Sequence, residues 1–368
     1  MTYCPNSAVA CFFLACLGGV TPWAALASSL KPDEQVVLYP ALGRPVAGGW
    51  EIAVHGLVYE PDGRRWTAAL MREILGLDEK SLTAEERSTF RQRIDYFLVD
   101  NERRKTFTVL AGDQPFRFGR SAANGHFNLR WGWPTNNTLF ASWCGTASNG
   151  VARLLLPLAQ TNRGPLALDI HFLSETGLSV ISDIDDTIKI SEVRDRDALL
   201  RNTFCRPFRS VPGMAARYRQ WQAQDAAQFH YVTASPWQLY LPLAQFAQAN
   251  HFPAGTFHMK EFRLKDRSAL SLFSAPENYK RHVIEPLLQQ FPRRAFVFIG
   301  DSGEKDPEIY GELARRHPQQ VRRIFIRNVT NEDADAARFR QAFRDVPRQV
   351  WQIFNEPSEL PGRLSPVG

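Results

Sequence analysis

Three carboxylates follow one apolar stretch of the sequence. Asp183, Asp185 and Asp186 lie within four positions, directly after the apolar run at 178–182. Carboxylates this close repel one another, and a bound divalent cation is one physical reason to keep them together. Alternate positions at a strand end can face the same crevice, so we expect Asp183 and Asp185 to act together and Asp186 to point elsewhere. A helix-capping cluster is the simpler alternative, because Asp and Thr both cap helices well.

A second acidic group follows the apolar run at 295–299. Asp301 and Asp306 lie in the loop that starts at Gly300, a residue that lets the backbone approach other groups closely. Oxygen ligands without a nearby His or Cys select a hard ion, and a few carboxylates with room for water and phosphate suit Mg²⁺. The sequence therefore predicts a Mg²⁺ and phosphate site.

A hydroxyl and a lysine complete the candidate set. Thr233 and Ala234 follow the apolar run at 229–232, and a hydroxyl with free backbone N–H groups at a strand-to-helix turn can bind phosphoryl oxygens. Lys280 begins a predicted helix, where its charge opposes the helix dipole. Lys265 is the alternative lysine; we favour Lys280 because its helix leads directly into the strand that ends at Asp301.

A serine hydrolase is a poor fit to the same loop. The residues from Gly300 to Gly303 resemble a serine-protease active-site loop, but Glu304 stands where that loop needs Gly. The chain also has no His in a comparable signature.

The elements that carry these residues have a parallel-sheet pattern. Nearly continuous apolar runs at 178–182, 229–232, 295–299 and 321–326 alternate with predicted helices at 213–224, 236–249, 278–291, 306–316 and 331–346. This alternation is typical of a mostly parallel α/β sheet covered on both faces, whose ligands lie beyond the carboxyl ends of the strands. The candidate residues lie at those ends.

The preceding region has a different period. Between 35 and 173 apolar residues alternate with polar ones, which predicts an all-β sandwich. One insertion, from Thr67 to Leu98, has a capping box at Thr83–Glu86 and an apolar stripe at helical spacing. We expect this stripe to pack against the sandwich; a membrane surface is the alternative.

The first 27 residues contain no Lys, Arg, Asp or Glu and include an apolar run too short to span a bilayer. This predicts a signal peptide at 1–27, with a lipid anchor or a buried helix as alternatives, and a protein exported to the periplasm or envelope with no transmembrane helix in its mature chain. Cys144 and Cys205 then remain, and two small buried residues are favoured over a disulfide bridge.

Length and composition fit a two-domain globular protein. The chain has 368 residues, 44% of them hydrophobic, and a formal charge of +6 without a polybasic tail. Because nucleic-acid signatures are missing, we expect no nucleic-acid partner. The predicted regions are 1–27, a β-sandwich at 28–173 and an α/β domain at 174–368.

The order of the motifs resembles the haloacid dehalogenase superfamily of phosphohydrolases. The segments 182–189, 233–240 and 300–310 are similar to the phosphatidate phosphatase family of the actin-patch-protein type, across roughly 171–330. The resemblance implies a haloacid-dehalogenase-like Rossmannoid sheet and a Mg²⁺-dependent phosphatase. It also implies a phosphorylated substrate, with phosphatidate at a membrane surface as the first choice.

The resemblance also implies roles for individual residues. Asp183 would be the nucleophile that forms an aspartyl phosphate, and Asp185 the general acid and then base. Thr233, Ala234 and Lys280 would bind phosphate, and the metal would be held by Asp183, Asp185 through its backbone carbonyl, Asp301 and Asp306. A phosphatase of another phosphomonoester, such as a phosphoprotein or sugar phosphate, and a non-catalytic envelope binding module are the alternatives.

The segment between Thr187 and Gly213 is too short for a large cap domain, which suits a bulky substrate. It contains five arginines, Arg194, Arg196, Arg201, Arg206 and Arg209. These could contact anionic lipid headgroups or form a solvated face.

Overall fold

A six-stranded parallel sheet forms the centre of the C-terminal region in the computed structural model, which describes residues 29–61, 68–111, 114–134, 150–159, 164–261 and 279–364. The predictions for residues 1–27, Cys144 and Lys265 lie outside these residues. The strands follow the order β12 (Gly255–Lys260), β11 (Gln228–Pro236), β10 (Leu178–Asp183), β13 (Ala295–Asp301), β14 (Val321–Arg327) and β15 (Trp351–Phe354). All five neighbouring pairs are parallel, which confirms the predicted α/β class.

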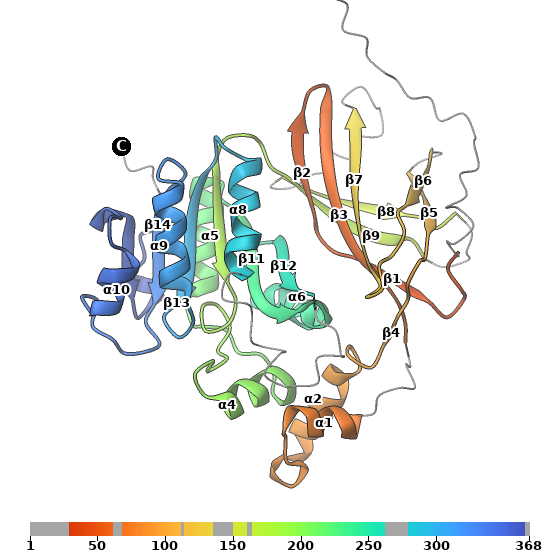
Figure 1. Ribbon diagram of the computed structural model, residues 1–368, viewed down its shortest axis with the longest axis horizontal. Helices are drawn as coiled ribbons and strands as arrows, with labels where there is room; N and C mark the ends of the chain where they lie inside the picture. The colour runs from red at the N-terminus through yellow and green to blue at the C-terminus, as the bar shows by residue number, and fades with distance from the viewer. Residues whose placement is uncertain are drawn as a thin grey trace, which may run out of the picture.

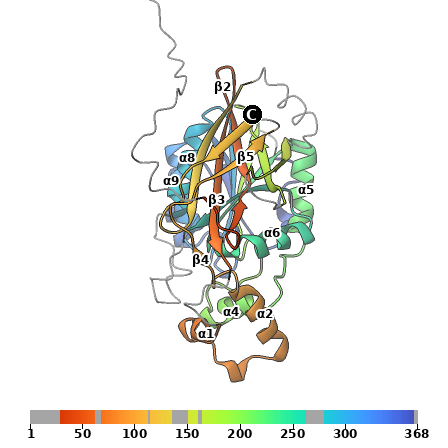
Figure 2. The same cartoon turned by 90° about the vertical axis from the view of Figure 1, so that its right-hand side faces the viewer.

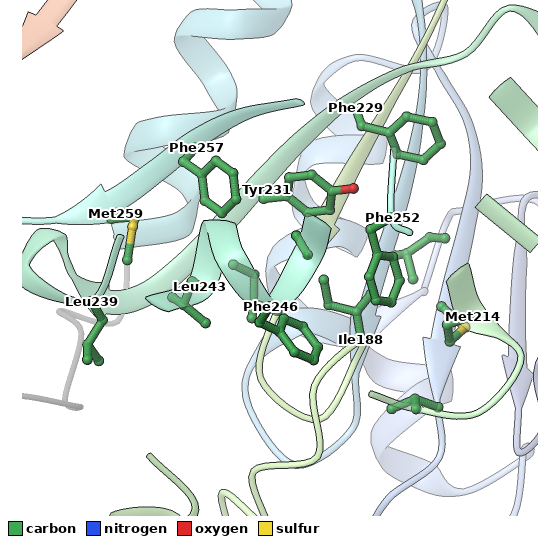
Figure 3. Packing of buried hydrophobic residues seen from close by; sticks show 14 of the residues in the cluster. Ile188, Met214, Phe229, Tyr231, Leu239, Leu243, Phe246, Phe252, Phe257 and Met259 are labelled. Carbon is green, nitrogen blue, oxygen red and sulfur yellow. The ribbon is translucent and has the colours of Figure 1, made fainter. Parts of the chain in front are cut away.

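Helices cover both faces of this sheet. Figure 2 shows α5 (Met214–Asp225) and α6 (Tyr240–Ala249) on one side, and α8 (Tyr279–Gln290) and α9 (Asp306–Arg316) on the other. Because successive strand residues point to opposite faces, Val180 belongs to the core that includes α5 and α6, and Ile181 to the core that includes α8 and α9. Figure 3 shows Leu243 and Phe246 of α6 beside aromatic residues of β11 and β12.

Some predicted boundaries were wrong. The strands β12 and β15 were not predicted, and β11 continues past 232 through Thr233 to Pro236. The helix predicted at 331–346 is only α10 (Ala337–Ala342). The polar residues at the start of the predicted range do not form a helix. The helix cannot continue to 346, because Asp345 has a positive φ and Pro347 disfavours helical geometry in the residue before it.

The N-terminal region is rich in β-structure and mostly antiparallel, as its period-two pattern predicted. Its seven-stranded sheet contains β1 (Gln35–Leu38), β2 (Ala41–Val46), β3 (Gly49–Glu60), β4 (Asp100–Asn101), β7 (His126–Pro134), β8 (Val151–Leu156) and β9 (Leu166–Phe172). A separate hairpin of β5 (Phe107–Ala111) and β6 (Gln114–Phe118) shares a core with this sheet, where Phe107 contacts Phe127. Only the pairing of β2 with β9 is parallel among the described strands of this region.

The helical insertion lies beside the α/β region (Figure 1). It contains α1 (Ala68–Leu75), η2 (Glu79–Ser81) and α2 (Ala84–Ile94), and the capping box at Thr83 and Glu86 is confirmed. Its apolar stripe packs against η3 (Arg201–Cys205), which follows α4 (Arg196–Leu200), with the rings of Phe97 and Phe204 5.6 Å apart. The contact with the α/β region was not predicted; the same buried cluster also contains Leu57 of β3, from the region that was predicted as the partner.

Polar contacts strengthen the same junction. Arg93 donates to the backbone oxygen of Thr203 at 2.5 Å, and Glu86 accepts from Arg206 at 2.9 Å and from Arg201 at 3.4 Å. Arg201 and Arg206 therefore hold the insertion in place, a role that neither sequence interpretation of these arginines included. Cys205 is a buried free thiol in this junction, and burial raises its pKa to about 11.

None of the helices in the described part of the chain has the length and apolar character that a bilayer crossing requires.

Candidate active site

Three buried carboxylates meet at the carboxyl edge of the parallel sheet. Asp183 ends β10, Asp301 ends β13 and Asp306 begins α9. One oxygen of each lies within 4.8 Å of the others, and each side chain is at most 1% exposed. The sequence-predicted metal ligands from two separate strands are thus brought together.

Gly300 makes this close approach possible. A Cβ at this position would lie 2.1 Å from Oδ2 of Asp306, well inside van der Waals contact. Oδ2 of Asp306 instead accepts a hydrogen bond from the backbone N–H of Asp301 at 3.2 Å. The glycine therefore lets α9 begin with its acid directed back to the end of β13.

Lys280 provides the positive charge of this cluster. Its Nζ lies 2.8 Å from Asp183, 2.9 Å from Glu304 and 2.5 Å from Asp306. Burial alone would lower the pKa of Lys280, but the three carboxylates outweigh it and raise the pKa well above its usual value. The first turn of α8 thus directs this lysine into the cluster.

The cluster has more negative than positive charge. Burial, reinforced by neighbouring acids, raises the pKa of both Asp183 and Asp301 well above its ordinary value. Oδ1 of Asp301 accepts from the backbone N–H groups of Gly303 and Glu304, whereas Oδ2 is buried and receives no hydrogen bond within the described residues. One oriented carboxylate oxygen without a donor, among other carboxylates and without His or Cys, fits a hard divalent cation.

Asp185 occupies a separate hydrogen-bonded position. Its Oδ1 lies 2.7 Å from Lys189 Nζ and accepts from Ser191 at 2.8 Å; its Oδ2 accepts from Thr233 at 2.9 Å and Ser235 at 3.3 Å. Burial would raise the pKa of Asp185, but Lys189 and these hydroxyls lower it to about 2. Asp185 is therefore a carboxylate at neutral pH.

The turn after β10 separates Asp186 from Asp183 and Asp185. Asp186 has φ 54° and accepts three backbone hydrogen bonds, from Ser191, Glu192 and Val193. Asp186 lies outside the cluster of Asp183, Asp301 and Asp306, as expected, but so does Asp185, which was expected to act together with Asp183. Thr187 donates to Asp183 Oδ2 at 3.0 Å.

Thr233 and Ala234 lie within β11 and are buried, with Thr233 completely inaccessible. The Thr233 hydroxyl donates to Asp185 and accepts from the backbone N–H of Ser235. Thr233 and Ala234 were predicted at a strand-to-helix turn, but they lie inside the strand, and the helical turn η4 (Trp237–Leu239) begins only after Pro236. The structure places Thr233 beside Asp185.

Sequence reasoning missed Lys189, Ser191 and Glu304. Lys189 and Glu304 lie within the motif segments 182–189 and 300–310, but nothing in a single sequence shows which acid a lysine contacts. The spacing of four from Asp185 to Lys189 was the available signal. It becomes a contact because the turn after Asp183 brings the two residues together.

Comparison with known proteins places this site in a recognised segment. Residues 178–328 match the family described as phosphatidate phosphatase APP1, catalytic domain. The chain is 33% identical over 193 residues to phosphatidate phosphatase APP1 of Saccharomyces cerevisiae, an alignment that covers 52% of this chain and 31% of the yeast protein. It is 29% identical over 168 residues to an uncharacterized protein of Schizosaccharomyces pombe, covering 45% of this chain and 27% of that protein. The chain thus spans less than a third of the length of each of these relatives.

Proposed function

We propose that this protein is a Mg²⁺-dependent phosphomonoester hydrolase of the haloacid dehalogenase type, with phosphatidate as its substrate. One observation carries the proposal. Asp183, Lys280, Asp301 and Asp306 converge at one sheet edge, within the segment that matches the phosphatidate phosphatase APP1 catalytic domain. Diacylglycerol and inorganic phosphate are the expected products.

Asp183 is the nucleophile in this proposal. Its carboxylate oxygen forms a bond to phosphorus while the bond from phosphorus to the lipid oxygen breaks, which gives an aspartyl phosphate. Lys280, 2.8 Å from Asp183, stabilises the negative charge that the carboxylate and the phosphoryl group bring together. Mg²⁺, held by Asp183, the backbone carbonyl of Asp185 and Asp301 with help from Asp306, would supply further charge neutralisation.

Asp185 transfers the protons. It is ionised in the free protein, and the negative charge of an arriving phosphate raises its pKa, so that it can take up a proton and give it to the leaving alkoxide. The regenerated carboxylate then removes a proton from the water that attacks the aspartyl phosphate. Thr233 and Ser235 orient the carboxylate for both steps.

A covalent-trapping experiment tests this assignment. An aryl phosphate leaves without protonation, so Asp185→Ala is expected to accumulate a phosphoenzyme, whereas Asp183→Asn forms none because the attacking oxygen is absent. Rapid-quench mass spectrometry of both variants measures the bound phosphate. Phosphate on neither variant, or inversion of configuration at phosphorus in the wild-type reaction, contradicts the covalent mechanism.

A substrate screen tests the choice of lipid. Phosphatidate, a sugar phosphate and a phosphopeptide are compared with and without Mg²⁺. The expected result is Mg²⁺-dependent hydrolysis of phosphatidate with the highest kcat/KM. A preference for a soluble substrate contradicts the lipid assignment, and no hydrolysis of any substrate supports a non-catalytic module.

Export to the periplasm or envelope is part of the proposal and rests on the uncharged first 27 residues. Intact-mass measurement on protein from the native cell is expected to give a chain beginning near Ser28. A cytosolic chain that retains Met1 contradicts it.

A further inference from the structure

A cavity of about 500 Å³ lies between the N-terminal region and the α/β region. This volume is within the range of roughly 300–1,000 Å³ that is usual for small-molecule sites. The cavity is bounded by three parts of the chain that are distant in sequence: β1 and β3, the residues just after α2, and the start of α6. Side chains from these three parts that the argument uses are Val37, Tyr39, Leu57, Leu98, Trp237 and Leu241.

The cavity adjoins the candidate active site through β11. Ser235 donates to Asp185 at 3.3 Å, and Trp237, two residues further along, lines the cavity. Two residues span at most about 7 Å, so the wall of the cavity begins within about 7 Å along the backbone of the residue that contacts Asp185. Trp237 is held in place by packing against Tyr39 and His55, with ring centroids 4.1 Å and 4.6 Å away.

The lining suits an uncharged, apolar group. Aliphatic and aromatic side chains form most of the wall, and Asp95, an exposed residue, is the only charged one among the described lining residues. A phosphate is poorly accommodated there, because the cationic Lys280 lies in the catalytic cluster and no Lys or Arg is among the described residues that line the cavity. The described lining of the cavity is therefore mostly apolar, whereas the neighbouring catalytic cluster is charged.

We propose that this cavity binds the hydrocarbon chain of the phosphomonoester that the catalytic carboxylates hydrolyse. The inference rests on the proposed function and adds a role for the N-terminal region. The walls from β1, β3 and the helical insertion lie outside the matched segment 178–328, so only the wall that includes Trp237 and Leu241 belongs to the segment shared with the family. The N-terminal region completes the substrate site by selecting phosphates that have an apolar chain.

A chain-length series measures the effect. The substrates are monoacylglycerol phosphates of increasing chain length, kept below the concentration at which they form micelles, with an aryl phosphate as the chainless reference. For the wild type, kcat/KM rises by up to about fourfold for each added methylene until the cavity is full. In Val37→Trp the indole fills the cavity, so the rise is flattened while aryl phosphate hydrolysis is unchanged.

Matched variants separate this effect from damage to the fold. Val46→Trp introduces the same side chain on β2, at a position 40% exposed and outside the cavity, and is expected to keep the wild-type chain-length dependence. Leu241→Asp is a second cavity variant at a position 37% exposed, where a charged residue is compatible with folding. It is expected to reduce the rise of kcat/KM with chain length, as Val37→Trp does.

Calorimetric titration with a monomeric saturated fatty acid tests the cavity without catalysis. The wild type and Val46→Trp are expected to bind it, and Val37→Trp and Leu241→Asp to bind at least tenfold more weakly. Phosphatase activity with no chain-length dependence and no fatty-acid binding overturns the chain subsite and leaves the proposed function intact. Fatty-acid binding without hydrolysis of any phosphomonoester overturns the proposed function, and with it the substrate role of the cavity.

Discussion

The buried acids form two groups that differ in how far their charge is balanced. One group contacts Lys189 and the other contacts Lys280. Among the described residues, Lys189 forms an ion pair with Asp185 and with no other acid, which keeps that carboxylate ionised. Lys280 is shared between Asp183, Asp306 and Glu304, so the charge of that group is only partly balanced. The first arrangement suits a group that exchanges protons, and the second suits a group that binds a cation and phosphate.

Lys189→Met is expected to lower both activity and stability. The substitution keeps the length of the side chain but leaves the buried Asp185 without its 2.7 Å ion-pair partner. Loss of one partner of a buried pair costs about 3–5 kcal/mol in the free energy of unfolding. Urea denaturation measures this loss.

Lys80→Met is the matched control, because Lys80 is exposed in η2 and far in sequence from the site. Its unfolding free energy is expected to change by less than about 0.5 kcal/mol. Equal stability of the Lys189 variant and the wild type would show that Lys189 does not neutralise Asp185.

Asp301→Asn is expected to separate activity from stability. The amide removes a charge that is buried beside other acids, so the melting temperature is expected to stay equal or rise. Activity is expected to fall by roughly two orders of magnitude or more, since a preorganised electrostatic group is lost, and to need more Mg²⁺. Melting curves and Mg²⁺ titrations of activity measure the two effects; a fully active, metal-independent variant rules out the proposed metal site.

At the scale of elements, the sequence predicted what depends on local pattern. The continuous apolar runs of β10, β13 and β14 and the capping box of α2 were all visible, and the strand ends located the acids. The strand β12 was missed because Thr256, His258 and Lys260 interrupt its apolar character. The contact of α2 with η3 was missed because residues more than a hundred positions apart in sequence form it.

The buried His171 of β9 is expected to make stability depend on pH. It is 3% exposed, and burial lowers its pKa from 6.5 to about 4. Because the unfolded chain takes up the proton more readily, the folded state loses stability as pH falls below about 6.5, with a loss of about 2 kcal/mol at pH 5. Above pH 7 this contribution is constant.

Urea denaturation of the wild type and His171→Gln at pH 7 and pH 5 measures this effect. Between pH 7 and pH 5, the free energy of unfolding of the variant is expected to fall by about 2 kcal/mol less than that of the wild type. The same pH dependence in both proteins would mean that His171 is protonated in the folded state or does not titrate in this range.

At the scale of the whole molecule, the two predicted domains share a hydrophobic core. One cluster of buried residues includes Leu57, Met71 and Phe97 from the N-terminal region together with Phe204 and Trp237 from the α/β region. Figure 1 shows the helical insertion beside α4 at this junction. Separation of the two regions would expose these side chains to water, so the boundary near 173 divides the secondary-structure pattern but not the core.

The shared core predicts that residues 174–368 alone are less stable than the same region in the full chain. Without the N-terminal region, Phe204 and Trp237 lose apolar contacts, and the isolated segment is expected to unfold at lower urea concentration and to bind a hydrophobic dye.

In the full chain, Phe97→Ala is expected to cost about 3–5 kcal/mol in the free energy of unfolding and to speed hydrogen exchange in both regions. Leu155→Ala, at a position 62% exposed on β8, is the control and is expected to change neither the free energy of unfolding nor the rate of hydrogen exchange. If the isolated segment is as stable as in the full chain and Phe97→Ala affects the N-terminal region alone, the two regions fold independently, and the junction would then be a contact between separate domains.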